Sequence, residues 1–103
     1  MSQRKLSIVV RREMLPLPSP YVSPRSPTEE KLAAIWCESL SMDRVGVKDA
    51  YEELGIDSFL AAAIFSEIEE VFGVSIPMAT LLTAPTIEQL AVAVDAATRG
   101  AAT

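Results

Sequence analysis

The sequence predicts an all-α fold, a small bundle of three longer helices and one short helix. Two capping boxes, Ser26-Pro-Thr-Glu29 and Thr86-Ile-Glu-Gln89, each mark a helix start, because the first hydroxyl can accept a hydrogen bond from the amide three residues later. Apolar residues recur at helical spacing after each box and again over residues 58–72. Half of the 103 residues are hydrophobic, which is enough to bury one modest core.

The first helix is expected to run from Pro27 to near Ser41. Proline suits the first helical position because its missing N–H would have no partner there. The Ser26 oxygen should accept from the Glu29 amide, while the Glu29 side chain reaches back. The residues expected to form the buried face are Leu32, Ile35, Trp36 and Leu40.

A long connection follows this helix, through Val45-Gly-Val47 and Tyr51 to Gly55. Within it, we expect Asp49 to cap a short turn over residues 50–54. A connection of this length in so small a domain is more often functional than accidental.

The second helix is expected over residues 58–72, with Asp57 as its N-cap and Gly73 just past its end. Its predicted buried stripe consists of Leu60, Ala61, Ile64, Ile68 and Val71. The opposite face carries Phe59, Ala62, Ala63, Ser66, Glu69 and Glu70.

The third long helix is expected to open at the second capping box. A short helix over residues 78–82 should precede it and end before Pro85, since the residue before a proline avoids helical geometry. The residues of the last helix expected to point inward are Ile87, Leu90, Ala91 and Val94. The predicted domain therefore spans residues 27–98, and residues 99–103 should form a disordered tail.

Residues 1–26 are expected to form a flexible, basic, proline-rich leader. Five of the seven prolines lie within residues 16–27, which favours an extended and semi-rigid linker. The stretch Leu6–Val10 has strand-like composition, but a lone strand is unstable, so we expect disorder there. Arg11 and Arg12 are interpreted as solubilising charges. Met1 is interpreted as a genuine start, which indicates a freestanding protein.

Composition excludes several classes of function. The absence of histidine leaves no Ser-His-Asp or Cys-His nucleophile and no imidazole metal site. The single cysteine, Cys37, cannot form an internal disulfide and suits a reducing cytoplasm. No apolar stretch is long enough to span a membrane. We therefore expect a cytoplasmic protein without a metal site and without catalytic residues of its own.

The net charge of −5 is unevenly distributed along the chain. Residues 1–27 hold five basic groups and one acid, a charge of +4, so residues 28–103 carry the remaining −9. An acidic body would repel phosphate, which argues against nucleic acid as a partner. It favours partners with positively charged faces.

The most informative site is Leu54-Gly-Ile-Asp-Ser58. It places a serine hydroxyl at the start of a helix, where free amides and partial positive charge favour an attached anion such as a phosphate. The simpler interpretation is that Asp57 and Ser58 are only good helix starters. The dipeptide alone favours that simpler interpretation.

The surrounding residues resemble the acyl and peptidyl carrier proteins, which carry phosphopantetheine. The run Asp49-Ala-Tyr-Glu-Glu-Leu-Gly-Ile-Asp-Ser58-Phe is similar to the family signature Asp-x-Phe-Phe-x-Leu-Gly-Gly-Asp-Ser-Leu. Further matching stretches are Leu32-Ala-Ala-Ile-Trp36, Val71-Phe-Gly-Val-Ser-Ile-Pro77 and Ala84-Pro-Thr86 with Leu90. The resemblance covers residues 15–97. Ile56 and Phe59 depart from the signature, which has glycine and leucine at these positions.

The resemblance implies the four-helix fold of acyl carrier proteins and a prosthetic-group mechanism. A separate transferase, with its own magnesium and coenzyme A, would place 4′-phosphopantetheine on Ser58, with Asp57 flanking the attachment site. The thiol of that group would hold an acyl or aminoacyl cargo as a thioester. The protein would be a monomeric, non-catalytic carrier whose partners are the transferase, an adenylating or acyl-loading enzyme, and a condensation enzyme or synthase.

The subtype is interpreted as peptidyl, because the helix face beyond Ser58 is apolar. The residues expected to dock partners are Phe59, Ala62, Ala63 and Met78, although core filling explains Met78 equally well. An acyl carrier of a fatty-acid or polyketide pathway is the alternative subtype. An unmodified helical interaction module is the alternative from a different class, and an autonomous hydrolase lacks a general base. Trp36 and Cys37 are interpreted as core residues.

Overall fold

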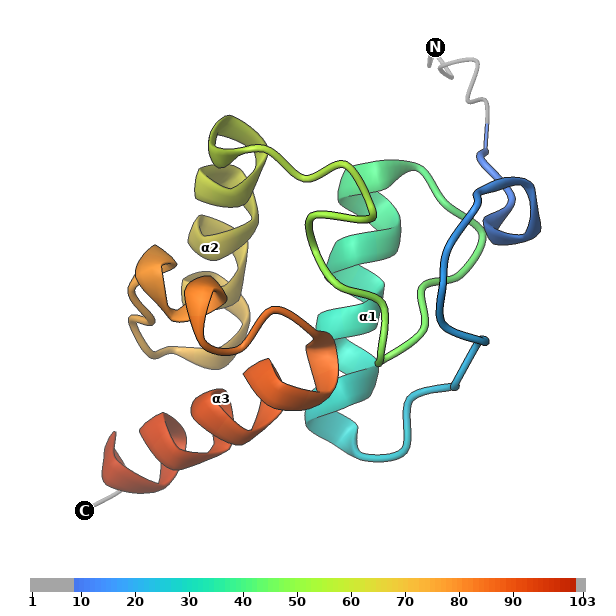
Figure 1. The fold of residues 1–103 in the computed structure, drawn as a ribbon. Coiled ribbons are helices and arrows are strands. Elements are labelled where there is room, and N and C mark those ends of the chain that lie inside the picture. Colours follow the sequence, from blue (N-terminus) through green and yellow to red (C-terminus); the bar gives the residue numbers. More distant parts are fainter. Residues whose placement is uncertain (1–8, 102–103) are drawn as a thin grey trace, which may run out of the picture.

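The computed structural model describes residues 9–101, and within that range every regular element is a helix (Figure 1). These elements are η1 (Arg12–Met14), α1 (Pro27–Leu40), α2 (Ser58–Phe72), η2 (Met78–Leu82) and α3 (Ile87–Ala101). Helix α1 packs against both α2 and α3, and η2 packs against α2. The all-α prediction is confirmed; the short helix is a single 3-10 segment of five residues.

The core lies between the three α-helices. The inward residues predicted for α3 are buried, as are three of the four predicted for α1, and Leu40 is half-buried. The prediction for α2 was wrong at two positions: Phe65 is buried, whereas Val71 is 43% exposed. Helix α2 is apolar at most positions, so its periodicity does not choose a face, and packing against both α1 and η2 decides which residues are covered.

The helix boundaries follow the predicted capping residues. The Ser26 Oγ accepts from the Glu29 amide at 3.1 Å, and Thr86 Oγ1 accepts from the Gln89 amide at 3.2 Å. The Glu29 carboxylate accepts from the Arg25 amide at 2.8 Å, one residue earlier than a capping box predicts. The disordered tail predicted from residue 99 is also corrected, because α3 continues to Ala101; residues 102–103 lie outside the described residues.

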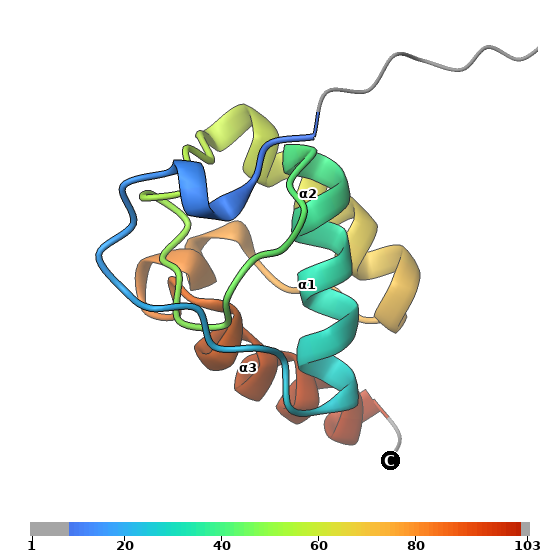
Figure 2. The same cartoon turned by 90° about the vertical axis from the view of Figure 1, so that its right-hand side faces the viewer.

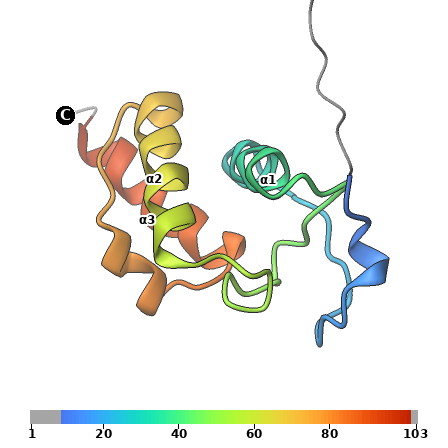
Figure 3. The ribbon, with the colours of Figure 1, turned by 90° about the horizontal axis from the view of Figure 1, so that it is seen from above.

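The predicted flexible leader is corrected for residues 9–26, which pack against the helical body. Figure 3 shows this segment on the side of α1 away from α2, and Figure 2 shows it running beside the connection over residues 41–57. Leu15, Leu17 and Val22 pack on the core, and backbone hydrogen bonds join Val10 to Ser41 and Asp43 at 2.7 and 2.9 Å. Val10 thus has backbone hydrogen-bond partners, which the sequence did not predict. Residues 1–8 lie outside the described residues.

Arg12 is the main anchor of this segment. Its guanidinium donates two hydrogen bonds to Asp49, at 2.6 and 2.7 Å, and a third to the Ser19 carbonyl oxygen at 2.7 Å. Arg12 is 8% exposed and Asp49 is 1% exposed, so the pair is buried. The hydrogen bond to Asp49 outweighs burial and raises the pKa of Arg12. The interpretation of Arg12 as a solubilising charge was therefore wrong.

Asp49 holds the connection over residues 41–57 to this anchor. The cap predicted for residues 50–54 was wrong, because the carboxylate accepts from the Gly46 amide at 2.8 Å as well as from Arg12. A Cβ on Gly46 would lie 3.1 Å from the Val22 amide nitrogen and 3.2 Å from Asp49 Oδ2. Glycine therefore permits a close approach at this point. The N-terminal segment and the connection form one packed layer here.

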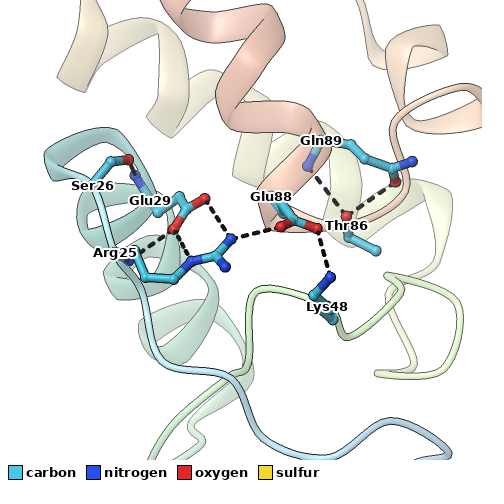
Figure 4. Close-up of polar contacts among 7 residues, drawn as sticks. All are labelled: Arg25, Ser26, Glu29, Lys48, Thr86, Glu88 and Gln89. Carbon is cyan, nitrogen blue, oxygen red and sulfur yellow. Dashed lines mark hydrogen bonds and ion pairs between the residues drawn. The ribbon is translucent and has the colours of Figure 1, made fainter.

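A second polar cluster joins four segments at the start of α3 (Figure 4). Arg25 pairs with Glu29 at 3.3 Å and with Glu88 at 2.6 Å, and Lys48 reaches Glu88 at 3.4 Å. Burial raises the pKa of Glu29, but the hydrogen bonds from Arg25 outweigh it and lower the pKa overall. The hydrogen bond from Arg25 also lowers the pKa of Glu88. These contacts connect the N-terminal segment, α1, the connection and α3.

Candidate functional site

The site begins where the connection turns into α2. Backbone hydrogen bonds close a compact turn over residues 50–56, among them those from Leu54 to Ala50 at 3.2 Å and from Ile56 to Tyr51 at 3.1 Å. Gly55 has φ +83°, a conformation that favours glycine. Leu54 and Ile56 are buried on either side of it. The turn therefore locks the backbone immediately before Asp57 and Ser58.

Asp57 caps α2, as predicted. Its Oδ1 accepts from the Leu60 amide at 2.8 Å, and Ser58 is the first helical residue. Both residues are exposed. The Ser58 hydroxyl thus lies in solvent at the positive end of a 15-residue helix, where an attached phosphate is electrostatically favoured.

Ser58 also forms part of the rim of a cleft of about 270 Å³ between the connection, α2 and η2. Met78, predicted to dock partners, lies in this cleft together with Asp57. The full lining consists of Tyr51, Asp57, Ser58, Ala61, Met78, Ala79, Leu81 and Leu82. Most of these side chains are apolar, so the cleft suits an apolar group held close to Ser58.

The sequence did not indicate Tyr51 as a cleft residue. Its amide donates to the Pro85 carbonyl at 2.9 Å, and the neighbouring Ala50 pairs with Thr86. These contacts bring the connection against the segment between η2 and α3. Residues more than thirty positions apart in the sequence thus lie side by side here. Helical periodicity does not predict contacts of this kind.

The other predicted docking residues lie on the exposed side of α2. Phe59 is 87% exposed, and Ala62 and Ala63 are exposed one turn further along the helix. On η2, Leu82 is 77% exposed and Met78 is 39% exposed. We call these five residues the apolar surface. Large apolar side chains left this exposed are characteristic of interaction sites when they gather beside a functional residue.

The two residues interpreted as core differ from each other. Trp36 is 1% exposed, as predicted. Cys37 is half-buried, and burial raises the pKa of its thiol, which disfavours the reactive thiolate.

Two absences hold for residues 9–101. In that range no helix is long and apolar enough to cross a membrane. The same residues contain no group of three or more His, Cys, Asp or Glu side chains placed to hold a metal ion.

Comparison with known proteins gives a family match over residues 30–94, to the family described as "Phosphopantetheine attachment site". A linear gramicidin synthase chain of Brevibacillus parabrevis is 42% identical over 89 residues, which cover 79% of this chain and 2% of that protein. The chain therefore spans only about a fiftieth of the length of this relative.

Solved structures agree with the sequence match. A chain in the structure of the phosphopantetheine transferase Sfp in complex with coenzyme A and a peptidyl carrier protein is 32% identical, with a TM-score of 0.71 over 74% of this chain and 99% of that one. BlmI, a type-II acyl carrier protein from Streptomyces verticillus involved in bleomycin biosynthesis, is 32% identical. Its TM-score is 0.64 over 67% of this chain and 83% of that one.

Proposed function

The chain belongs to the family of phosphopantetheine attachment domains, and from that premise we propose that it works as a peptidyl carrier with Ser58 as its attachment residue. Members of this family are non-catalytic carriers of 4′-phosphopantetheine. The observation that supports Ser58 is its exposed hydroxyl at the first residue of α2, capped by Asp57 and adjoining an apolar cleft.

The residues around Ser58 suit a phosphate ester followed by an arm whose first section is apolar. The free amides at the start of α2 favour the phosphate, and the cleft walls favour the apolar part of the arm. When bound, the group supplies the thiol that holds an acyl or aminoacyl cargo as a thioester. On attachment, the Ser58 oxygen forms a bond to phosphorus, the pyrophosphate bond of coenzyme A breaks, and adenosine bisphosphate leaves. The serine proton passes to the transferase.

The proposed partners are a phosphopantetheinyl transferase, an adenylating enzyme and a condensation enzyme. The peptidyl subtype is supported by the similarity to linear gramicidin synthase and to a structure that contains a peptidyl carrier protein. The apolar surface supports it as well, because Phe59 and its neighbours offer hydrophobic contacts beside Ser58. Asp57 would lie against the transferase while it caps the helix.

The proposal extends to architecture and location. We count η2 as the short fourth helix of the carrier bundle, since it packs against α2 and contributes Met78 to the cleft. The carrier domain is proposed to span residues 27–98, with residues 9–26 packed on it. We propose a monomer in the cytoplasm, where a lone cysteine stays reduced.

Intact-mass spectrometry after incubation with coenzyme A and a broad-specificity transferase tests the function. We expect one phosphopantetheine on the parent chain and none on Ser58→Ala, because no other hydroxyl replaces the attacking oxygen. Ser66→Ala is the matched control, since Ser66 is an exposed serine on the same helix. Absence of the addition on the parent chain, or its persistence in Ser58→Ala, would contradict the proposal.

A further inference from the structure

The cleft beside Ser58 includes this residue in its own lining, so a group attached to Ser58 starts next to the cleft. Ser58 and Asp57 form one part of its lining, and Ala61, one turn into α2, is 3% exposed within it. Met78, Leu81 and Leu82 of η2 line it as well. Whatever is bonded to Ser58 therefore starts at the edge of an apolar cleft.

The order of apolar and polar groups along the arm matches this cleft. After the phosphate come a methylene and then a quaternary carbon with two methyl groups, and a hydroxyl and the first amide follow. The section of the arm that lies in the cleft next to Ser58 should therefore be apolar, and the section immediately after it should be polar. The volume of about 270 Å³ is close to the lower end of small-molecule pockets, about 300 Å³, so it suits one section of the arm.

Tyr51 is the one lining residue of the connection before Asp57, and it carries the polar atom that this order requires. The signature quoted above has phenylalanine at this place, which carries no hydroxyl, whereas this chain has tyrosine. The Tyr51 backbone is held by its bonds to Pro85 and Ile56. Among the residues that the structure describes, none hydrogen-bonds to the Tyr51 hydroxyl, which leaves it available to a ligand.

We propose that the cleft seats the dimethyl section of the phosphopantetheine arm and that the Tyr51 hydroxyl hydrogen-bonds to the hydroxyl or first amide beyond it. This inference rests on the proposed function, because it needs the arm on Ser58. Seating the near end of the arm gives it a preferred resting direction, along η2 and away from Phe59. Phe59, Ala62 and Ala63, the α2 part of the apolar surface, then stay open to partners while the far end of the arm, with its thiol, remains outside the cleft.

The test uses the full chain loaded with phosphopantetheine, with loading confirmed by mass spectrometry before spectra are recorded. We expect nuclear Overhauser effects between the two arm methyl groups and the methyl groups of Met78 and Leu81. Tyr51→Phe should reduce the seated fraction of the arm about fivefold, the factor that corresponds to one net hydrogen bond. Tyr21→Phe, which removes the other phenol of the chain outside the cleft, is the matched control and should leave the seated fraction unchanged.

The outcomes separate this inference from the proposed function. A chain that never gains the arm would overturn the proposed function, and this inference with it. A loaded chain whose arm methyl groups contact neither Met78 nor Leu81 would overturn this inference alone. Equal effects of Tyr51→Phe and Tyr21→Phe would overturn the role of Tyr51.

Discussion

Two regions, one at the middle of the connection over residues 41–57 and one at its exit into α2, reverse the usual distribution of polar and apolar side chains. Near its middle, Arg12 and Asp49 form a buried charged pair. At its exit, Phe59 stands 87% exposed beside Ser58. Charged residues are usually outside and large apolar residues inside. The first region stabilises the fold, and we propose that the second serves recognition.

The physical difference lies in what each region loses when one side chain is removed. Removal of Arg12 leaves the Asp49 carboxylate buried without its charge partner. Removal of Phe59 exposes little that was covered before, because its side chain already lies in solvent. Substitutions in the first region should therefore change stability, and substitutions in the second should change partner binding. Three experiments test this difference.

The largest effect on stability is expected for Arg12→Ala. An unpaired buried carboxylate should lower the free energy of unfolding by about 3–5 kcal/mol, measured by urea denaturation followed by circular dichroism. Arg12→Lys should fall between the parent and Arg12→Ala, because lysine keeps the charge but loses the two-pronged contact.

Arg11→Ala is the matched control for Arg12→Ala. Arg11 pairs with Glu13 at 2.9 Å on the surface, so its removal should cost about 0.5 kcal/mol or less. If Arg12→Ala and Arg11→Ala unfolded at the same urea concentration, residues 9–26 would not be part of the stable body.

An intermediate effect is expected from the Arg25 cluster, and it should depend on pH. Contacts with Arg25 hold the pKa values of Glu29 and Glu88 below their ordinary value of about 4.5. A lowered pKa in the folded state gives stability that is fully present above the unfolded pKa and is lost as the pH falls through the folded pKa. The free energy of unfolding should therefore fall with decreasing pH below about 4.5.

Arg25→Ala should flatten this dependence. Without the guanidinium, the two carboxylates lose the contact that favours their charged form, so the slope of stability against pH should be smaller in acid. Urea titrations at a series of pH values measure this slope. Arg11→Ala is the control, because it removes the same charge elsewhere. A slope in Arg25→Ala equal to that of the parent would show that the cluster does not contribute.

The smallest effect on stability, and the largest on recognition, is expected for Phe59→Glu. The free energy of unfolding should change by about 0.5 kcal/mol or less, as for other exposed positions. Loading by an adenylating enzyme should lose roughly tenfold in kcat/KM, because an exposed aromatic anchor of a docking surface is replaced by a charge. Val92→Glu, at an exposed apolar position of α3, is the control that should load normally.

Unfolding of Phe59→Glu would assign Phe59 to the core and remove the division between the two regions. Normal loading of Phe59→Glu would instead locate the docking surface elsewhere on the carrier.

The sequence predicted features whose causes lie within a few residues. The caps at Ser26, Asp57 and Thr86 are local hydrogen bonds, and their positions set where the three α-helices begin. The inward residues of α3 were predictable because polar residues flank a single apolar stripe. In α2 the same reasoning omitted Phe65 from the buried stripe and wrongly included Val71, since a helix that is apolar on several sides has no unique inner face.

The sequence alone predicted the helices, the serine at the start of α2 that we propose as the attachment residue, and the carrier resemblance, because capping and periodicity act over three to seven residues. Only the tertiary structure decided that residues 9–26 belong to the body and that Tyr51 lines the cleft. The Arg12–Asp49 contact spans 37 positions along the chain. Which distant groups meet in a low-dielectric interior depends on the packing of the whole chain, and no local pattern encodes that packing.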